Sequence, residues 1–221
     1  MNIAENINLI RSKINQAAKI NLHNPSAINL VAVSKNFGST EIEVAINSGC
    51  RIFGENKVNE AKEKWPKLKE KYPEIKLHLI GHLQSNKVKD AVKLFDVVES
   101  LDSEKLAEIL AMEMTKQNKF LEIFVQINIG EEEQKSGISP QDADQFIKKA
   151  INDYKLNVTG VMGIPPANEN PALYFALLTT IAKRNNLKNI SMGLSGDYET
   201  AIALGANFIR VGSAIFGTRT I

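Results

Sequence analysis

Lys35 is the residue of this sequence whose type and position could do the most distinctive chemistry. It follows the apolar, β-branched run 30–34, which is typical of a buried strand. The carboxyl end of a strand is where α/β folds place their ligands. A neutral lysine amine condenses with an aldehyde to give an imine, and desolvation or nearby cations favour the neutral form. The alternative is a lysine that ends the strand and extends its ammonium group into water.

Two turns rich in glycine and serine could bind an anion. They span residues 192–197 and 210–213, each at the end of a predicted strand. Glycine lets the backbone approach an anion closely, serine adds a hydroxyl donor, and a following helix presents unpaired amides. Either turn alone could equally be a simple chain reversal. Because the loops after the seventh and eighth strands of a barrel often bind phosphate, the two turns together predict a phosphate site.

Two further polar residues stand at predicted strand ends. Arg210 interrupts an otherwise apolar strand, so it is either a structural ion pair or contact, or a cation inside the mouth of a barrel. In a closed barrel the first and eighth strands are neighbours, so such a cation would lie near Lys35 and favour its neutral amine. Asn56 ends the second strand, where its carboxamide either hydrogen-bonds a ligand hydroxyl or caps the next helix.

Other catalytic or metal-binding patterns are not found. His78 and His82 have no third ligand at metal-site spacing, so we expect histidines that pack or line a pocket rim, and no metal. The sequence holds no Ser/His/Asp arrangement, P-loop or CxxC pair. The single cysteine, Cys50, allows no internal disulfide and is better explained by packing than by nucleophilic chemistry.

The elements that must position these residues alternate along the chain. Apolar runs predict eight strands, at 30–35, 51–54, 77–80, 97–100, 120–129, 158–164, 189–194 and 208–211. Helices are expected between the strands, and an amphipathic helix over 3–20 precedes the first one. Ser39, Ser103 (or Asp102) and Ser139-Pro140 are the predicted starts of three of these helices.

This order of elements predicts a fold class. Eight βα units without a break in composition predict an α/β protein with one domain over residues 1–221, a single (β/α)8 TIM barrel preceded by an N-terminal helix. The alternative is a doubly wound open sheet, but its glycine-rich fingerprint after the first strand is missing.

The overall composition narrows the classes of partner. Apolar residues make up 43% of the 221 residues, which is enough for a sizeable core. The net charge of +2, with both signs interspersed, does not indicate a nucleic-acid surface. No apolar run approaches the roughly 18 residues of a spanning helix, and the N-terminus lacks a signal peptide's apolar centre. We therefore expect a cytoplasmic protein with no nucleic-acid or membrane partner.

Seven short segments carry a resemblance to a known family. In order they are 32–35 (AVSK), 53–56 (FGEN), 78–87 (HLIGHLQSNK), 135–137 (KSG), 162–165 (MGIP), 191–197 (SMGLSGD) and 209–217 (IRVGSAIFG). Together they resemble the pyridoxal 5′-phosphate (PLP) homeostasis proteins, which are single-domain relatives of the N-terminal barrel of alanine racemase. The resemblance spans nearly the whole chain, and the ordered set is far more specific than any single segment.

The resemblance implies a PLP site. Lys35 would carry PLP as a Schiff base, Arg210 would face the pyridine nitrogen, and Asn56 would lie near the ring. The sequence departs from the family pattern at Lys57, where an aromatic residue is common, and at Asn59, where glutamine is usual. Both departures fall at a helix start beside the site, where they could alter the pocket rim.

The resemblance also implies how the phosphate is held. Ser195, Gly212 and Ser213 would contact the phosphate, and Met192 would line the site. These positions match the family pattern, so the departures leave the expected phosphate contacts intact.

Two arguments predict a carrier of PLP for intracellular PLP homeostasis, with no catalytic residue. Arg210 can only donate hydrogen bonds, so the pyridine nitrogen is expected to stay unprotonated and the ring to be a weaker electron sink. The racemase relatives take a second base from an added β domain and a dimer, whereas this sequence ends at Ile221. We expect a monomer, with PLP-dependent apoenzymes as recipients. The alternatives are a PLP-dependent amino-acid racemase or related PLP enzyme, and an aldolase-type Schiff-base barrel without a cofactor.

Overall fold

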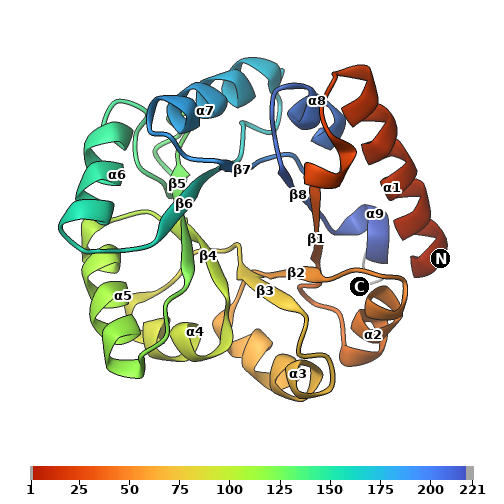
Figure 1. Ribbon diagram of the computed structural model, residues 1–221, viewed down its shortest axis with the longest axis horizontal. Coiled ribbons are helices and arrows are strands. Elements are labelled where there is room, and N and C mark those ends of the chain that lie inside the picture. The colour runs from red at the N-terminus through yellow and green to blue at the C-terminus, as the bar shows by residue number, and fades with distance from the viewer. Residues whose placement is uncertain (1, 218–221) are drawn as a thin grey trace.

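The barrel predicted from the sequence is present. The computed structural model describes residues 2–217, and its eight parallel strands pair in chain order until β8 meets β1 and closes the sheet (Figure 1). The strands are β1 (Asn29–Val33), β2 (Ile52–Glu55), β3 (Lys76–Leu79), β4 (Val97–Leu101), β5 (Glu122–Ile127), β6 (Val158–Gly163), β7 (Asn189–Ser191) and β8 (Phe208–Val211). This closure confirms the TIM-barrel fold class and excludes the open sheet, which would leave two edge strands.

Helices surround the barrel and connect its strands (Figure 1). They are α1 (Ile3–Ile20), α2 (Ser39–Asn47), α3 (Val58–Lys71), α4 (Val88–Leu94), α5 (Glu104–Gln117), α6 (Ala143–Asn152), α7 (Ala172–Arg184), α8 (Tyr198–Ala203) and α9 (Ser213–Phe216), with short 3-10 turns η1 (Pro25–Ala27) and η2 (Ser85–Lys87). The predicted N-terminal helix is α1, which buries Ile7, Ile10 and Ile14 and packs beside α8 and α9. Within residues 2–217, no helix is both long and apolar enough to cross a membrane.

Four strands are shorter than predicted. β6 (Val158–Gly163) and β7 (Asn189–Ser191) end before the predicted limits of 164 and 194. β1 ends at Val33, because the Phe37 N–H turns back to donate to the Ser34 carbonyl oxygen at 3.1 Å. Lys35 therefore lies in the turn after β1, two residues past the strand. β5 occupies Glu122–Ile127 within the predicted 120–129.

One of the three predicted helix starts is confirmed in detail. The Ser103 side chain caps α5 as expected. The Ser39 side chain makes no capping hydrogen bond to α2. α6 begins later than predicted, because Ser139 and Asp142 form a closed turn first. In that turn the Asp142 N–H donates to the Ser139 carbonyl oxygen at 3.2 Å, and the Ser139 hydroxyl donates to the Asp142 carboxylate at 2.7 Å.

The barrel interior holds both apolar and polar side chains. One apolar cluster consists of Val97, Phe124, Met162 and Phe208. Four buried polar side chains contact one another inside the barrel. They are His78, Glu99, Ser191 and Arg210, each at most 2% exposed. Barrel interiors are usually filled by branched apolar residues, so these charged groups need partners inside the barrel.

Candidate functional site

The predicted site residues follow the carboxyl ends of neighbouring strands. Lys35 follows β1, Asn56 follows β2, and the two Gly/Ser turns follow β7 and β8. β1 pairs in parallel with both β2 and β8, so these strand ends meet on one rim of the barrel. This is the rim at which barrel proteins bind their ligands.

Lys35 and the turn after β8 line one small cavity. It has a volume of about 210 Å³ and is lined by Val33, Lys35, Asn36, Phe37, Gly212, Ser213 and Gly217. The turn comes close to β1, since a Cβ on Gly212 would lie 3.3 Å from the Val33 Cβ, a tight contact that Val33 would have to yield to by a few tenths of an ångström. Pockets for drug-sized ligands measure about 300–1,000 Å³, so this cavity suits one small molecule.

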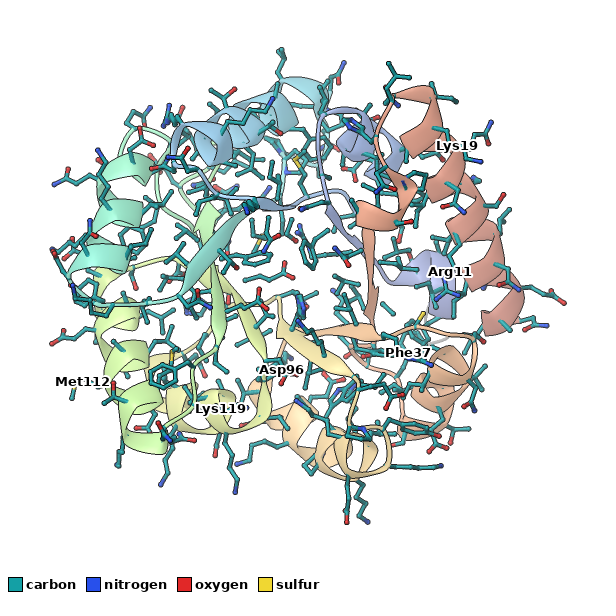
Figure 2. All side chains as sticks on the ribbon, in the orientation of Figure 1. Arg11, Lys19, Phe37, Asp96, Met112 and Lys119 are labelled. Atoms are coloured by element: carbon teal, nitrogen blue, oxygen red, sulfur yellow. The ribbon has the colours of Figure 1, made fainter. Side chains whose placement is uncertain are left out.

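An aromatic pair joins the two sides of this cavity. Phe37, two residues after Lys35, stacks on Phe216 of α9 with ring centroids 4.9 Å apart and an interplanar angle of 26°. Figure 2 shows Phe37 beside α9. α9 begins at Ser213, so the stack ties the Lys35 turn to the turn after β8 and helps to fix the distance between them.

Ser195 and Ser213 bring the two Gly/Ser turns together. Their hydroxyl oxygens lie 3.2 Å apart. The N–H groups of Ser195, Gly196, Ser213 and Ala214 donate to no main-chain acceptor within the described part of the chain. Hydroxyl and free N–H donors on two adjoining turns form an arrangement that binds phosphate groups.

The turn that carries Ser195 is held in place by a main-chain hydrogen bond from β8 and by the Asp197 side chain. Gly193 adopts a positive φ of 89°, and its carbonyl oxygen accepts the Arg210 N–H at 3.0 Å. The Asp197 carboxylate accepts the Leu194 N–H at 2.5 Å. A Cβ on Gly193 would lie 2.6 Å from the Ala201 Cβ, so both the conformation and the space require glycine.

Arg210 lies inside the barrel, in a network of buried polar groups. Its guanidinium donates to the Ser191 hydroxyl at 2.5 Å and to the Gly163 carbonyl oxygen at 3.0 Å, and it lies 3.7 Å from the Glu99 carboxylate. The Ser191 hydroxyl donates to the same Glu99 oxygen at 2.6 Å, and His78 Nδ1 contacts the other oxygen at 2.6 Å.

Burial and neighbouring charges shift the pKa values of Glu99 and Arg210 in opposite directions. Burial raises the pKa of Glu99, but the hydrogen bond and charge of His78, the charge of Arg210 and the Ser191 hydroxyl together hold that pKa below its ordinary value. Burial lowers the pKa of Arg210, opposed by Glu99, and the guanidinium remains a cation. An ionised carboxylate only accepts hydrogen bonds, so His78 Nδ1 carries the hydrogen in its contact with Glu99.

Arg210 was expected to favour the neutral amine of Lys35, but within residues 2–217 its guanidinium makes no direct contact with Lys35. β1 and β8 are neighbours as predicted, and Val31 pairs with Arg210 in the sheet. However, the guanidinium contacts Glu99, Ser191 and Gly163, which belong to β4, β7 and β6. The effect of Arg210 on the charge of the Lys35 amine therefore stays a prediction.

Asn56 and Met192 are not among the residues that line the Lys35 cavity. Asn56 lines a separate cavity of about 400 Å³ on the same rim, together with Lys57, Gly81 and His82. Met192 is completely buried in the main apolar core. The cofactor contacts expected of Asn56 and Met192 stay predictions.

The two histidines have different surroundings. His78 is buried in the barrel, whereas His82 lines the rim cavity with Asn56 and contacts the Asp102 carboxylate at 3.0 Å. Among residues 2–217, no group of three or more His, Cys, Asp or Glu side chains could hold a metal ion.

Sequence reasoning missed two parts of the site. It did not identify Glu99 as the partner of Arg210, although a carboxylate in the apolar strand 97–100 was a signal of the same kind. It expected unpaired amides at the helix starts but could not name Gly196 and Ala214, because every non-proline residue carries an N–H group and only the chain path leaves one unpaired.

The fold and the rim define a class. The chain is a parallel barrel of the type described as alanine racemase, N-terminal domain, a family that matches residues 2–220. Alanine racemase from Corynebacterium glutamicum shares this fold with a TM-score of 0.71 at 17% identity, covering 99% of this chain and 61% of the racemase.

Relatives within this class identify a narrower group. The pyridoxal phosphate homeostasis protein of Haemophilus influenzae is 35% identical over 229 residues, covering 99% of this chain and 97% of the relative. That of Escherichia coli K12 is 35% identical over 228 residues, covering 98% and 97%. The structure of PipY from Synechococcus elongatus with PLP bound matches with a TM-score of 0.83 at 32% identity, covering 97% and 100%. The chain belongs to the pyridoxal phosphate homeostasis protein family.

Proposed function

We propose that this protein binds pyridoxal 5′-phosphate, with Lys35 forming a Schiff base to its aldehyde. The observation that carries this proposal is the single cavity lined by Lys35, Gly212 and Ser213. The Ser195 hydroxyl lies 3.2 Å from that of Ser213, so the hydroxyls of both turns can reach the same phosphate. PipY, a relative of similar length, is described with PLP bound, which supports the same ligand here.

The donors on the rim fit the chemistry of PLP. When bound, PLP supplies an aldehyde that reacts reversibly with amines. Lys35 presents an amine on one side of the cavity, and its side chain is exposed. On the other side, the hydroxyls and free N–H groups of the two turns hold the phosphate and thereby orient the ligand.

We further propose that the protein stores and releases PLP for PLP-dependent apoenzymes and has no catalytic residue. The exposed position of Lys35 supports release, because water and other amines can reach the covalent link. Arg210 faces the pyridine nitrogen in this proposal. Its guanidinium has no acceptor lone pair, so it keeps that nitrogen unprotonated and the ring a weaker electron sink. Intracellular PLP homeostasis fits these properties. The cytoplasmic location and the monomeric state stay predictions.

The test is covalent capture at Lys35. Purified protein is incubated with PLP, its absorbance is recorded before and after borohydride, and the mass of the Lys35 peptide is measured. We expect an absorbance band that borohydride removes and a pyridoxyl-phosphate mass added to this peptide. Lys35→Ala should lose both signals. Lys57→Ala, which removes an exposed lysine on the same rim outside the Lys35 cavity, should keep them.

The alternatives give different results in the same assays. Turnover of an amino acid that disappears in Lys35→Ala would favour a racemase or related PLP enzyme. A missing band together with no added mass, in protein saturated with PLP, would favour a Schiff-base barrel that uses no cofactor.

A further inference from the structure

The main chain on both sides of Lys35 is held by a buried lysine from another element. Lys64 of α3 donates from Nζ to the Ser34 carbonyl oxygen at 2.9 Å and to the Phe37 carbonyl oxygen at 3.1 Å. Only 8% of the Lys64 side chain is exposed. The turn that presents Lys35 is therefore fastened at its beginning and at its end by one ammonium group.

A carboxylate from the same helix fastens the middle of this turn. Glu60 Oε1 accepts from Lys64 Nζ at 2.9 Å and from the Asn36 N–H at 2.5 Å. Partial burial raises the pKa of Glu60, but the hydrogen bonds from Lys64 and Asn36 outweigh burial and hold that pKa below its ordinary value. Asn36 has a positive φ of 66°, a left-handed conformation that asparagine adopts more readily than most residues, and the Glu60 carboxylate binds its N–H in that conformation.

A second carboxylate closes the cluster from the barrel side. Glu55 is completely buried at the end of β2 and lies 2.9 Å from Lys64 Nζ. It accepts from the Ser34 hydroxyl at 2.6 Å and from Trp65 Nε1 at 3.0 Å. Burial raises the pKa of Glu55, and the contacts with Ser34, Lys64 and Trp65 oppose that rise.

Stability alone is a weak explanation for this cluster. A buried ion pair can often be replaced by apolar residues of the same volume without loss of stability. The contacts of Lys64 converge on Ser34 and Phe37, which bracket the proposed PLP lysine. Lys69, five positions further along α3, makes a similar set of contacts with Asp96 and the Leu94 carbonyl oxygen, away from the Lys35 turn.

We infer that Lys64 is a positioning residue for Lys35. Lys64 fixes where the Lys35 amine lies relative to an aldehyde whose phosphate is bound on the other side of the cavity. This inference rests on the proposed function. It follows that Lys64 acts mainly on formation of the covalent link and much less on binding of the phosphate, to which it connects indirectly, through the stack of Phe37 on Phe216. The phosphate donors belong to the turns after β7 and β8, whereas the hydrogen bonds and ion pairs of Lys64 within residues 2–217 are with Ser34, Phe37, Glu60 and Glu55.

The test compares PLP with pyridoxine 5′-phosphate, which has an alcohol in place of the aldehyde and cannot link to Lys35. Both affinities are measured by calorimetry for the intact protein and for Lys64→Met, which keeps an unbranched side chain of nearly the same length and removes the ammonium group. We expect the affinity for PLP to fall by about tenfold or more, since small displacements of a reacting group have large effects. We expect the affinity for pyridoxine 5′-phosphate to change by less than about threefold, because its contacts are unaltered.

Matched variants make the comparison decisive. Lys69→Met removes a lysine with similar contacts from the same helix and should change neither affinity. Lys64→Arg keeps a donor that can reach the same carbonyl oxygens and should recover part of the PLP affinity. If Lys64→Met does not fold, Glu60→Gln takes its place. It removes the negative charge of the carboxylate that accepts hydrogen bonds from both Lys64 and Asn36. A smaller loss, confined to PLP, is then expected.

Three results would overturn the inference. The first is an equal loss of affinity for both ligands in Lys64→Met, and the second is no loss of affinity for either ligand. The third is a loss of affinity for PLP that Lys69→Met reproduces. A wild-type protein that binds pyridoxine 5′-phosphate as tightly as PLP, and whose Lys35 peptide gains no mass after borohydride reduction, would instead refute the proposed function. The two failures are therefore distinguishable.

Discussion

The hydroxyl oxygens of Ser195 and Ser213 lie 3.2 Å apart, although the two residues belong to turns that follow different strands. Each turn approaches the other because β7 and β8 are neighbours in the closed barrel. A phosphate oxygen placed against this pair could accept from both hydroxyls at once. The phosphate half of the proposed site can therefore be tested separately from the Lys35 half.

Removing either hydroxyl should weaken binding through the phosphate. A hydrogen bond to a charged group contributes about 1.5–3 kcal/mol, so Ser213→Ala should lower the affinity for PLP about tenfold to a hundredfold. Ser195→Ala should act in the same direction. Titration of the PLP absorbance band measures both. Pyridoxal, which lacks the phosphate, is the control ligand, and an equal loss for pyridoxal would show that these hydroxyls support the fold instead.

Two glycines of one turn should respond differently to the same substitution. Gly193→Ala should destabilise the protein by about 1–3 kcal/mol, because the added Cβ overpacks the site at a positive φ. Gly196→Ala is the matched control, since no atom lies within 4 Å of the place its Cβ would take. Urea unfolding measures both variants. A Gly193→Ala protein as stable as Gly196→Ala would contradict the requirement for glycine at this turn.

The buried charge network should be more important for stability than a surface ion pair. Arg210→Met leaves Glu99 without its buried cation, and breaking a buried pair costs about 3–5 kcal/mol. Arg184→Met removes an ion pair with Asp144 in which both side chains are about 40% exposed, and such pairs contribute about 0–1 kcal/mol. Urea unfolding curves of the two variants give the comparison. Similar small losses would mean that Glu99 finds other partners when Arg210 is absent.

The same network predicts part of the pH dependence of stability. The pKa of Glu99 in the folded protein lies below its ordinary value of 4.5, so the unfolded chain binds more protons in the interval between the two values. The contribution of Glu99 is fully present above that interval and is lost as the pH falls through it. Glu99→Gln, compared with wild type by urea unfolding from neutral pH to about pH 3, should lose less stability on acidification. Equal losses would show that folding does not lower the pKa of Glu99.

Local patterns in the sequence were enough to predict the barrel. Short apolar runs predicted all eight strands, and glycine and serine marked the turns after β7 and β8. The exact ends were less predictable. A hydrogen bond to the Ser34 carbonyl oxygen ends β1 before its predicted boundary, and one to the Ser139 carbonyl oxygen makes α6 begin after its predicted start. A pattern of residue types does not reveal these contacts.

The candidate site was predicted in part. Lys35, Gly212 and Ser213 do line one cavity, and Ser195 lies against Ser213. The role of Lys64 could not be predicted, because a lysine in the highly charged sequence of α3 is indistinguishable from its solvated neighbours. Only the packing of α3 against the Lys35 turn buries Lys64.

The sequence by itself determined which groups stand at the ends of the strands, because strand periodicity and turn-forming residues act over a few neighbouring positions. Closure of the sheet decided which of these groups meet, since it brings the turns after β7 and β8 against the turn after β1. The tertiary structure alone paired Arg210 with Glu99 and Lys64 with the chain around Lys35. Those contacts join residues far apart in the chain, and their geometry exists only once the barrel has closed.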